Sequence, residues 1–269
     1  MPEGHTIHRA ARLQNKRLRG RPVQSESPQG RFASGASLVD GIELAKISAN
    51  GKHLFYEFAN DVIVHVHLGL FGKFRLRSLP TEDPVSENCR WLVTTANDRL
   101  HLAGPTACEV VDGEQVDAIR SRLGPDPLVK RHRRDPVETM ASRLHRRTIP
   151  IGAAILDQKV IAGLGNVYRA EILYRIGLDP FTPAREVDQS KLHALWTESV
   201  RLLRLGERSG RIVTTDPADV GRTRRSNIKA QERLYCYKRQ GEPCRRCGSI
   251  IRTADIDGRN IWWCPAEQS

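Results

Sequence analysis

The sequence has no apolar run long enough to cross a membrane. Its apolar stretches, such as residues 62–66, are far shorter than the roughly 18 to 20 residues that a membrane-spanning helix needs. The segment Met-Pro-Glu-Gly-His-Thr at the start has no apolar signal stretch, and the chain has no internal repeat or low-complexity tract. We therefore expect a globular protein of the cytoplasm, associated with the nucleoid if the source is bacterial.

Acidic residues are outnumbered by basic ones. The 269 residues include 43 Lys and Arg but only 31 Asp and Glu, which gives a net charge of +12. Such a surface attracts a polyanion or an anionic membrane, and without a membrane segment nucleic acid is the leading partner. Hydrophobic residues make up 39% of the chain, too many for a disordered protein. The length suits about two domains, with or without a small appended module.

Cysteine is scarce and unevenly distributed. Three of the six cysteines lie in the last 26 residues, two of them as Cys244-x-x-Cys247 and the third at Cys264. In a cytosolic chain this spacing favours a metal site over disulfides. Cys89 and Cys108 lie in expected strands, so we interpret them as buried structural residues.

Hydrophobic periodicity predicts a β-rich first domain, residues 1–120. Apolar positions followed by Gly20 indicate a short amphipathic helix over residues 6–18. Short segments rich in Val, Ile, Leu and Phe then alternate with turn residues, and they predict strands at residues 44–48, 53–58, 62–68, 71–76, 90–94 and 108–111. We expect this domain to be a β-sandwich with flanking helices.

A turn-rich, charged stretch at residues 124–134 separates a second, helical domain, residues 125–230. Its periodicity predicts helices at residues 136–146, 151–158, 167–176 and 188–205. Residues 206–230 lose this periodicity and carry several arginines, which predicts a mobile basic loop. Residues 235–269 are expected to form a small finger-like module with a β-hairpin. The predicted fold class is therefore α+β and multi-domain.

The N-terminal Pro-Glu pair is suited to a specific reaction. Removal of Met1 would leave Pro2 with a free secondary amine, a competent nucleophile near neutral pH. Such an amine attacking a sugar C1′ gives an iminium, which acidifies the C2′ hydrogen and permits β-elimination of the 3′ phosphate. Glu3, one residue away, can donate a proton to the departing base and later accept one.

Four further motifs lie along the chain in a fixed order. They are Gly51-Lys52-His53-Leu54, His67-Leu68-Gly69-Leu70-Phe71-Gly72, Gly163-Leu164-Gly165-Asn166-Val167-Tyr168, and the C-terminal finger Cys244-x2-Cys247-x16-Cys264. Each has a simpler interpretation by itself: a solvated hairpin lysine, an apolar pair in a strand, or an ordinary helix connection. With the N-terminal motif, however, the set resembles the Fpg/Nei DNA glycosylases over nearly the full length.

The resemblance implies a role for each matching residue. Pro2 is expected to be the Schiff-base nucleophile, Glu3 the general acid, and Lys52 a phosphate or proton-transfer partner. His67 is expected to contact a phosphate, while Leu70 and Phe71 fill the gap left by the everted base. In the following domain, a helix-two-turn-helix motif, Asn166 is expected to bind the strand beside the lesion. Arg259 in the finger hairpin would grip the adjacent phosphodiester.

The finger departs from the family pattern at its fourth ligand. The resemblance implies structural zinc, but Glu267 occupies the position where a fourth cysteine is expected. Three interpretations follow: zinc held by Cys244, Cys247, Cys264 and Glu267, zinc that recruits Cys236 instead, or a finger held by packing of Trp262 and Trp263 with weak or no metal binding.

Two further departures favour the Nei (endonuclease VIII) branch. Residues 5 and 6 are His-Thr, where many Fpg enzymes have Pro-Glu, and residues 97–102 lack the Asp-Pro-Arg-Arg-Phe-Gly loop of Fpg enzymes. We therefore expect a monomeric bifunctional DNA glycosylase and AP lyase of base excision repair. Its substrate would be double-stranded DNA with oxidised bases, pyrimidines favoured, or abasic sites. The duplex would be bound between the two domains, and no nucleotide or redox cofactor would be needed.

Two alternatives remain open from the sequence. A non-catalytic protein that binds damaged DNA would use the same helical domain and finger, but it would not require Pro2, Glu3 and Lys52 together. An RNA-binding or ribosome-associated protein can also contain helix-two-turn-helix elements, but the N-terminal motif is then unexplained.

Overall fold

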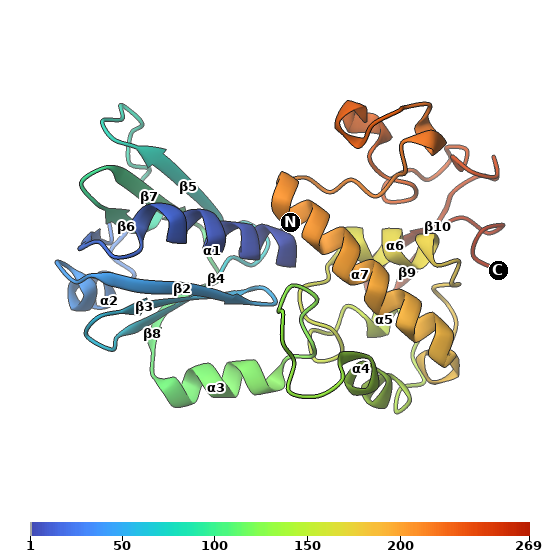
Figure 1. Ribbon diagram of the computed structural model, residues 1–269, viewed down its shortest axis with the longest axis horizontal. Helices are drawn as coiled ribbons and strands as arrows, with labels where there is room; N and C mark the ends of the chain where they lie inside the picture. The colour runs from blue at the N-terminus through green and yellow to red at the C-terminus, as the bar shows by residue number, and fades with distance from the viewer. Residues whose placement is uncertain (1) are drawn as a thin grey trace. The chain divides into compact units, whose positions relative to one another are not determined.

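The computed structural model describes residues 2–269 and divides the chain into two compact units (Figure 1). The first unit ends at Arg122 and the second is Leu123–Ser269. None of the helices within residues 2–269 combines the length and the apolar character that crossing a membrane requires.

The first unit is a β-sandwich flanked by helices. Its helices are α1 (Gly4–Leu18), α2 (Ala33–Val39) and α3 (Gly113–Arg122), and its strands are β1 (Gln24–Glu26), β2 (Leu44–Asn50), β3 (His53–Phe58), β4 (Ile63–His67), β5 (Lys73–Ser78), β6 (Cys89–Thr94), β7 (Asp98–Ala103) and β8 (Ala107–Val111). The strands form two antiparallel four-stranded sheets, in the orders β1-β6-β7-β5 and β2-β3-β4-β8.

The core lies between the two sheets because side chains alternate along each strand. Leu54 and Val66 are paired across β3 and β4, and both are fully buried. Trp91 of β6 lies at the centre, edge-on to Tyr56 at 4.9 Å between ring centroids, and its indole N–H donates to Ser25. The polar ends of the buried aromatic rings are thus hydrogen-bonded, which avoids a desolvation penalty.

Helix α1 is fixed to the second sheet by polar contacts as well as apolar ones. The Asn15 side chain accepts a hydrogen bond from the backbone N–H of Ile47 at 2.9 Å, and Gln14 accepts one from the Tyr56 hydroxyl at 2.6 Å. Ile7 and Leu18 are buried in the core of the sandwich. These contacts fix the helix, and therefore the residues at its N-terminal end, relative to the sheet.

The second unit is helical and ends in a β-hairpin. It contains α4 (Pro136–Leu144), α5 (Ile151–Ala154), α6 (Asn166–Arg175), α7 (Gln189–Ser209), the short 3-10 helices η1 (Ala184–Glu186), η2 (Ala218–Val220), η3 (Arg225–Asn227) and η4 (Ala230–Glu232), and the antiparallel strands β9 (Arg252–Ile256) and β10 (Arg259–Trp263). Asp135 and Asp188 cap α4 and α7 by accepting a backbone N–H of the first turn. Gly210, with a φ of 72°, ends α7.

A buried carboxylate joins α6 to the segment that leads into the finger. Glu171 is fully buried and accepts backbone N–H groups of Tyr235, Cys236 and Tyr237, each at 2.8 Å. The hydroxyl of Thr214 donates to the same carboxylate. Because four donors surround it, this charge is stabilised away from water.

The expected fold class is confirmed, while several elements differ in detail. Strand β5 begins at Lys73 because residues 68–72 form a turn, and α5 ends at Ala154 instead of continuing to residue 158. Helices α2 and α3 and strands β1 and β7 were not predicted. Cys89 and Cys108 are buried as expected, and burial raises their thiol pKa values to about 11 and about 12.

The segment predicted as a mobile loop, residues 206–230, is instead structured by helical turns and ion pairs. Helix α7 extends to Ser209, and η2 and η3 follow. Arg222 pairs with Glu232 at 2.6 Å, and the Arg225 guanidinium donates to the carbonyl of Val213 at 2.9 Å. The sequence pattern missed this order because these contacts join residues 10 and 12 positions apart without periodicity.

Replacing Glu171 by Gln should destabilise the second unit. An amide group would face donors where an oxygen now accepts, so at least one buried N–H would lose its partner, at a cost of roughly 1–3 kcal/mol. Thermal unfolding and hydrogen exchange at the amides of residues 235–237 would measure the change. Glu186→Gln, at a 55% exposed side chain, is the matched control. Unchanged exchange at those amides would contradict the structural role of Glu171.

Candidate active site and DNA-binding face

Pro2 and Glu3 lie at the N-terminus of α1. Glu3 is fully buried, and its carbonyl accepts the backbone N–H of Thr6 at 2.8 Å, so the acidic residue is built into the first turn of the helix. The helix dipole favours a negative charge at this end. Pro2 is partly exposed. The pair therefore combines an accessible N-terminal residue with a carboxyl group shielded from water.

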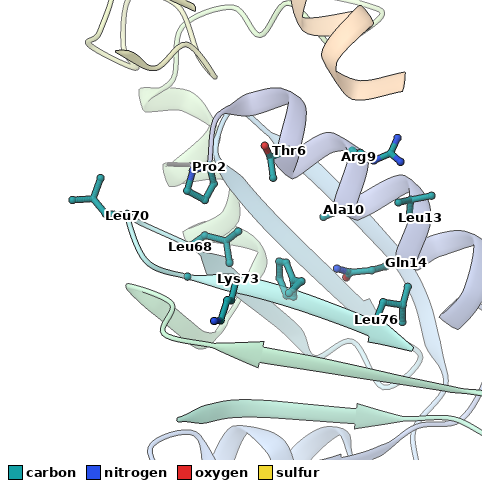
Figure 2. Close-up of a pocket in the computed structure, with 12 residues that line it drawn as sticks. Pro2, Thr6, Arg9, Ala10, Leu13, Gln14, Leu68, Leu70, Lys73 and Leu76 are labelled. Atoms are coloured by element: carbon teal, nitrogen blue, oxygen red, sulfur yellow. The ribbon is translucent and has the colours of Figure 1, made fainter. Parts of the chain in front are cut away.

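Pro2 lines a groove of about 590 Å³ between α1 and the start of β5 (Figure 2). Thr6 and Leu13 of α1 form one wall, and Leu68 and Leu70 lie on the opposite side. Pro2 therefore lies close to the turn that joins β4 to β5.

That turn presents two large apolar side chains to solvent. Leu70 is 61% exposed and Phe71 is 85% exposed, although neither belongs to a hydrophobic core. Gly69 has a φ of 64°, and a Cβ at Gly72 would lie 2.3 Å from the carbonyl oxygen of Leu68. Because both positions require glycine, the turn is tight and holds Leu70 and Phe71 outward.

Lys52 lies in a second tight turn at the same end of the sheet. Gly51, with a φ of 57°, and Lys52 connect β2 to β3, and the next residue, His53, pairs with His67 at the end of β4. This register places Lys52 beside the strand end that carries His67. His67 Nδ1 accepts the backbone N–H of Gly69 at 3.2 Å, so its ring proton is on Nε2 when the ring is neutral.

Burial favours the neutral form of three histidines of this unit, His5, His53 and His67. Burial lowers the pKa of His53 to about 3, with further lowering by His67, His65 and the positive charge of Lys52. Burial, followed by His65 and Lys52, also lowers the pKa of His67. Near α1, burial lowers the pKa of His5 to about 4, assisted by Arg9 and the N-terminal amine. The positive charge near the two turns therefore comes from lysines, Lys52 and Lys73, and not from these rings.

In the second unit, Asn166 and Arg259 are brought to one face. Asn166 begins α6, and its Nδ2 donates to the carbonyl of Asn260 in β10 at 3.2 Å. The buried guanidinium of Arg169 donates to the same carbonyl at 2.6 Å and to that of Arg259 at 3.4 Å. The Arg259 side chain itself is exposed. The helix N-terminus and the hairpin thus form one surface, with Arg169 beneath it.

Three of the four expected metal ligands lie together. The sulfur atoms of Cys244, Cys247 and Cys264 are all within 4.8 Å of one another, which suits a single metal ion. Among residues 2–269, neither Glu267 nor Cys236 belongs to this close group. Cys236 and Trp262 are buried in the apolar cluster around it, and Trp263 packs edge-on against Phe181.

Several positioning residues escaped the sequence interpretation. Arg169 is one, and Gln158 is another, since its side chain accepts the N–H of Gly163 and donates to the carbonyl of Leu164. Gln268 is 2% exposed and connects the backbone N–H of Cys264 to the carbonyl of Leu178. The sequence does not distinguish a buried polar residue from a solvated residue of the same type. Only the hydrogen bonds in the folded structure identify these positioning roles.

Comparison with known families agrees with this architecture. Residues 1–116 match the formamidopyrimidine-DNA glycosylase N-terminal domain, residues 123–217 match the formamidopyrimidine-DNA glycosylase H2TH domain, and residues 241–266 match the zinc finger found in FPG and IleRS. A β-sandwich, an H2TH domain and this finger define a DNA glycosylase, and the chain belongs to the Fpg/Nei family.

Individual relatives narrow the class further. The chain is 45% identical over 274 residues to Endonuclease 8 1 of Mycobacterium tuberculosis and 29% identical over 273 residues to Endonuclease 8 of Escherichia coli, each covering 100% of both chains. Its activity is that of an endonuclease VIII-like bifunctional DNA glycosylase/AP lyase in base excision repair of oxidised bases.

Solved structures of the family have the same fold. MutM in complex with DNA that contains carbocyclic 8-oxo-G has a TM-score of 0.81 at 25% identity and covers 100% of both chains. The Lactococcus lactis Fpg in complex with DNA that contains an abasic site has a TM-score of 0.80 at 25% identity and covers 99% of both chains.

Acid should destabilise the folded protein through His5 and His53. Their folded-state pKa values, about 4 and about 3, lie below the unfolded value near 6.5. The stability they contribute is fully present above pH 6.5 and is lost as pH falls toward the folded values, by at most about 1.4 kcal/mol per pH unit for each histidine.

Urea unfolding between pH 7 and pH 4.5 would measure this dependence. His5→Gln and His53→Gln should each flatten the slope of the unfolding free energy against pH, whatever their effect at pH 7. His193→Gln, at an exposed position of α7, is the control. Slopes as steep as that of the unaltered protein in both variants would show that other groups cause the acid sensitivity.

Proposed function

We propose that Pro2 is the nucleophile of this glycosylase, with Glu3 and Lys52 as its partners. The observation that carries the proposal is the groove in which Pro2 lies beside Leu68 and Leu70, next to the buried Glu3. The strand register supports a place for Lys52 at the same end of the sandwich. Met1 lies outside the described residues, and its removal is needed to free the amine.

The proposed reaction has two parts. The Pro2 nitrogen attacks C1′ of the damaged nucleotide, while Glu3 gives a proton to the departing base, and an iminium forms. Loss of the C2′ hydrogen then expels the 3′ phosphate by β-elimination, and δ-elimination expels the 5′ phosphate. The product is a gap with phosphate at both ends, and Lys52 stabilises the negative charge that develops near it.

The remaining contacts would hold and open the DNA. His67, with its proton on Nε2, is suited to donate to a phosphate oxygen. The exposed Leu70 and Phe71 are suited to fill the gap left when the base leaves the stack. Asn166 and Arg259, which share one face, would bind phosphates of the duplex, so binding should weaken strongly as salt rises.

We infer that oxidised pyrimidines are the preferred bases. Residues 98–103 form strand β7 and not a loop, and the connection from β7 to β8 is only residues 104–106. Such a short connection leaves no room for an Asp-Pro-Arg-Arg-Phe-Gly segment that would replace an everted purine. The enzyme would act as a monomer on double-stranded DNA in the cytoplasm.

We also propose that the finger holds zinc through Cys244, Cys247, Cys264 and Glu267. The three clustered thiols fit three positions of a tetrahedral site, and Glu267 follows Cys264 at the spacing of a knuckle. Zinc here would stabilise the hairpin that carries Arg259 and would take no part in the chemistry.

Borohydride trapping on an abasic-site oligonucleotide tests the role of Pro2. The processed protein should form a covalent adduct because the iminium is reduced in place. An N-terminal tag should abolish the adduct, while the same tag at the C-terminus, which leaves the amine free, should preserve it. Tight DNA binding with neither adduct nor strand cleavage would favour the non-catalytic damaged-DNA binder instead.

The Glu3→Gln variant separates the base-excision step of the proposed reaction from the lyase step. Because an abasic site has no base to protonate, this variant should still form the adduct there. Excision from oligonucleotides with an oxidised pyrimidine should fall by about 10² to 10⁴, the usual contribution of a general acid. Equal loss on both substrates would contradict the assignment of Glu3.

Faster excision of 8-oxoguanine than of oxidised pyrimidines by the unaltered protein would contradict the proposed lesion preference.

Metal content tests the finger. We expect about one zinc ion per chain, lost from Cys264→Ser, and released to a chelator faster in Glu267→Ala. Glu267→Cys should bind zinc more tightly, by roughly tenfold or more, since structural sites favour thiolates. Cys236→Ala is the matched control and should keep its metal. Loss of zinc from Cys236→Ala but not from Glu267→Ala would make Cys236 the fourth ligand.

A further inference from the structure

Arg246 lies between two of the clustered cysteines of the finger. Its backbone N–H donates to Cys244 Sγ at 3.5 Å, and Cys247 is the next residue in the chain. The sulfur atoms of both cysteines lie within 4.8 Å of that of Cys264. A metal ion held by these thiols would therefore also fix the backbone of Arg246, because the ion and the N–H···S bond constrain the same short turn.

The side chain of Arg246 contacts a part of the second unit that is distant in sequence. Its Nε donates to the carboxylate of Asp219 at 2.9 Å, and a terminal nitrogen lies 3.4 Å from the carboxylate of Asp216. These partners are 27 and 30 positions earlier in the chain. They belong to residues 214–222, which contain η2 and which we call the η2 segment. Arg246 thus connects the turn between the cysteines to the η2 segment.

Two stacked tyrosines hold the Arg246 guanidinium in place. The rings of Tyr174 and Tyr235 are 4.6 Å apart between centroids, and the guanidinium carbon of Arg246 lies 4.8 Å from the centre of the Tyr235 ring. The Tyr235 hydroxyl donates to Asp219 at 2.6 Å, and the Tyr174 hydroxyl lies 3.2 Å from Cys244 Sγ. Because a metal-bound thiolate accepts hydrogen bonds, Tyr174 would link the metal site to the same stack.

The two acidic residues depend on Arg246 to different extents. Asp216 also pairs with Arg175 at 3.0 Å and with Arg225 at 3.6 Å. Among residues 2–269, the ion-pair partner of Asp219 is Arg246 alone. The side chains of this pair are only 29% and 26% exposed, so the contact is better shielded from solvent than an ordinary surface salt bridge. Loss of Arg246 would therefore affect the turn around Asp219 most.

We propose that Arg246 makes the order of the η2 segment depend on metal binding in the finger. The proposal rests on the zinc site proposed above. With zinc bound, the turn that contains Arg246 is fixed, and its guanidinium holds Asp219. Without zinc, the turn is released and the η2 segment loses this anchor. Arg246 is a positioning residue that contacts neither the metal nor a reacting atom.

Amide hydrogen exchange before and after chelation of the zinc-loaded protein tests this coupling. The reporters are the backbone N–H groups of Asp216 and Arg222, both hydrogen-bonded within the folded unit. Chelation should speed their exchange by roughly tenfold or more, the scale of a lost charge-assisted hydrogen bond. The amides of residues 235–237 should stay protected, because Glu171 holds them independently of the metal.

Variants separate Arg246 from the metal itself. Arg246→Gln should exchange rapidly at the two reporters while it keeps its zinc, because all three thiols remain, and chelation should then add little. Asp219→Asn removes the other charge of the same ion pair and should have the same effect. Arg252→Gln, the same change at an exposed position of β9, is the matched control and should behave like the unaltered protein.

Three results would overturn the coupling. Chelation could remove zinc without changing exchange at the reporters, or Arg246→Gln could exchange there no faster than Arg252→Gln. Equal loss of protection at residues 235–237 would show general unfolding of the second unit instead. A protein that binds no zinc would refute the zinc site and the coupling together, and zinc content measured on the same samples distinguishes this failure from the other three.

Discussion

The pairing of β3 with β4 is the constraint on which the candidate active site depends. His53 opposite His67 sets the register, and a slip of one residue would turn the core side chains of the slipped strand to the outer face. The same register places the Gly51–Lys52 turn beside the turn that carries Leu70 and Phe71. Helix α1, fixed to the sheet through Asn15, then brings Pro2 to the groove next to that turn.

The second unit depends on a different set of contacts, which hold a small hairpin against helix α6. Two buried charges of α6 do this on different sides of the helix: Arg169 donates to carbonyls of the hairpin, and Glu171 accepts amides of the segment before the finger. Buried charges are costly unless every partner is present, so they specify one arrangement. The positions of Asn166 and Arg259 on a common face follow from these contacts.

The finger shows how the fold accommodates a departure from its family pattern. Where a fourth cysteine is expected the chain has Glu267, yet Cys244, Cys247 and Cys264 remain clustered. The next residue, Gln268, ties this segment to the carbonyl of Leu178, and an apolar cluster surrounds the thiols. The hairpin is thus held by packing and hydrogen bonds in addition to any metal, which explains how the substitution is tolerated.

The sequence by itself determined most of the elements and the motifs. Short segments rich in apolar residues predicted most strands of the sandwich, and helical periodicity predicted α4, α6 and α7. The glycines at positions 69 and 72 indicated the turn that presents Leu70 and Phe71. Only the tertiary structure decided that Arg246 contacts Asp216 and Asp219, that Arg169 and Glu171 are buried, and that residues 206–230 are ordered by ion pairs. The physical reason is that periodicity reports local burial, whereas a polar side chain acquires its role from partners that strand register and helix packing bring from distant positions.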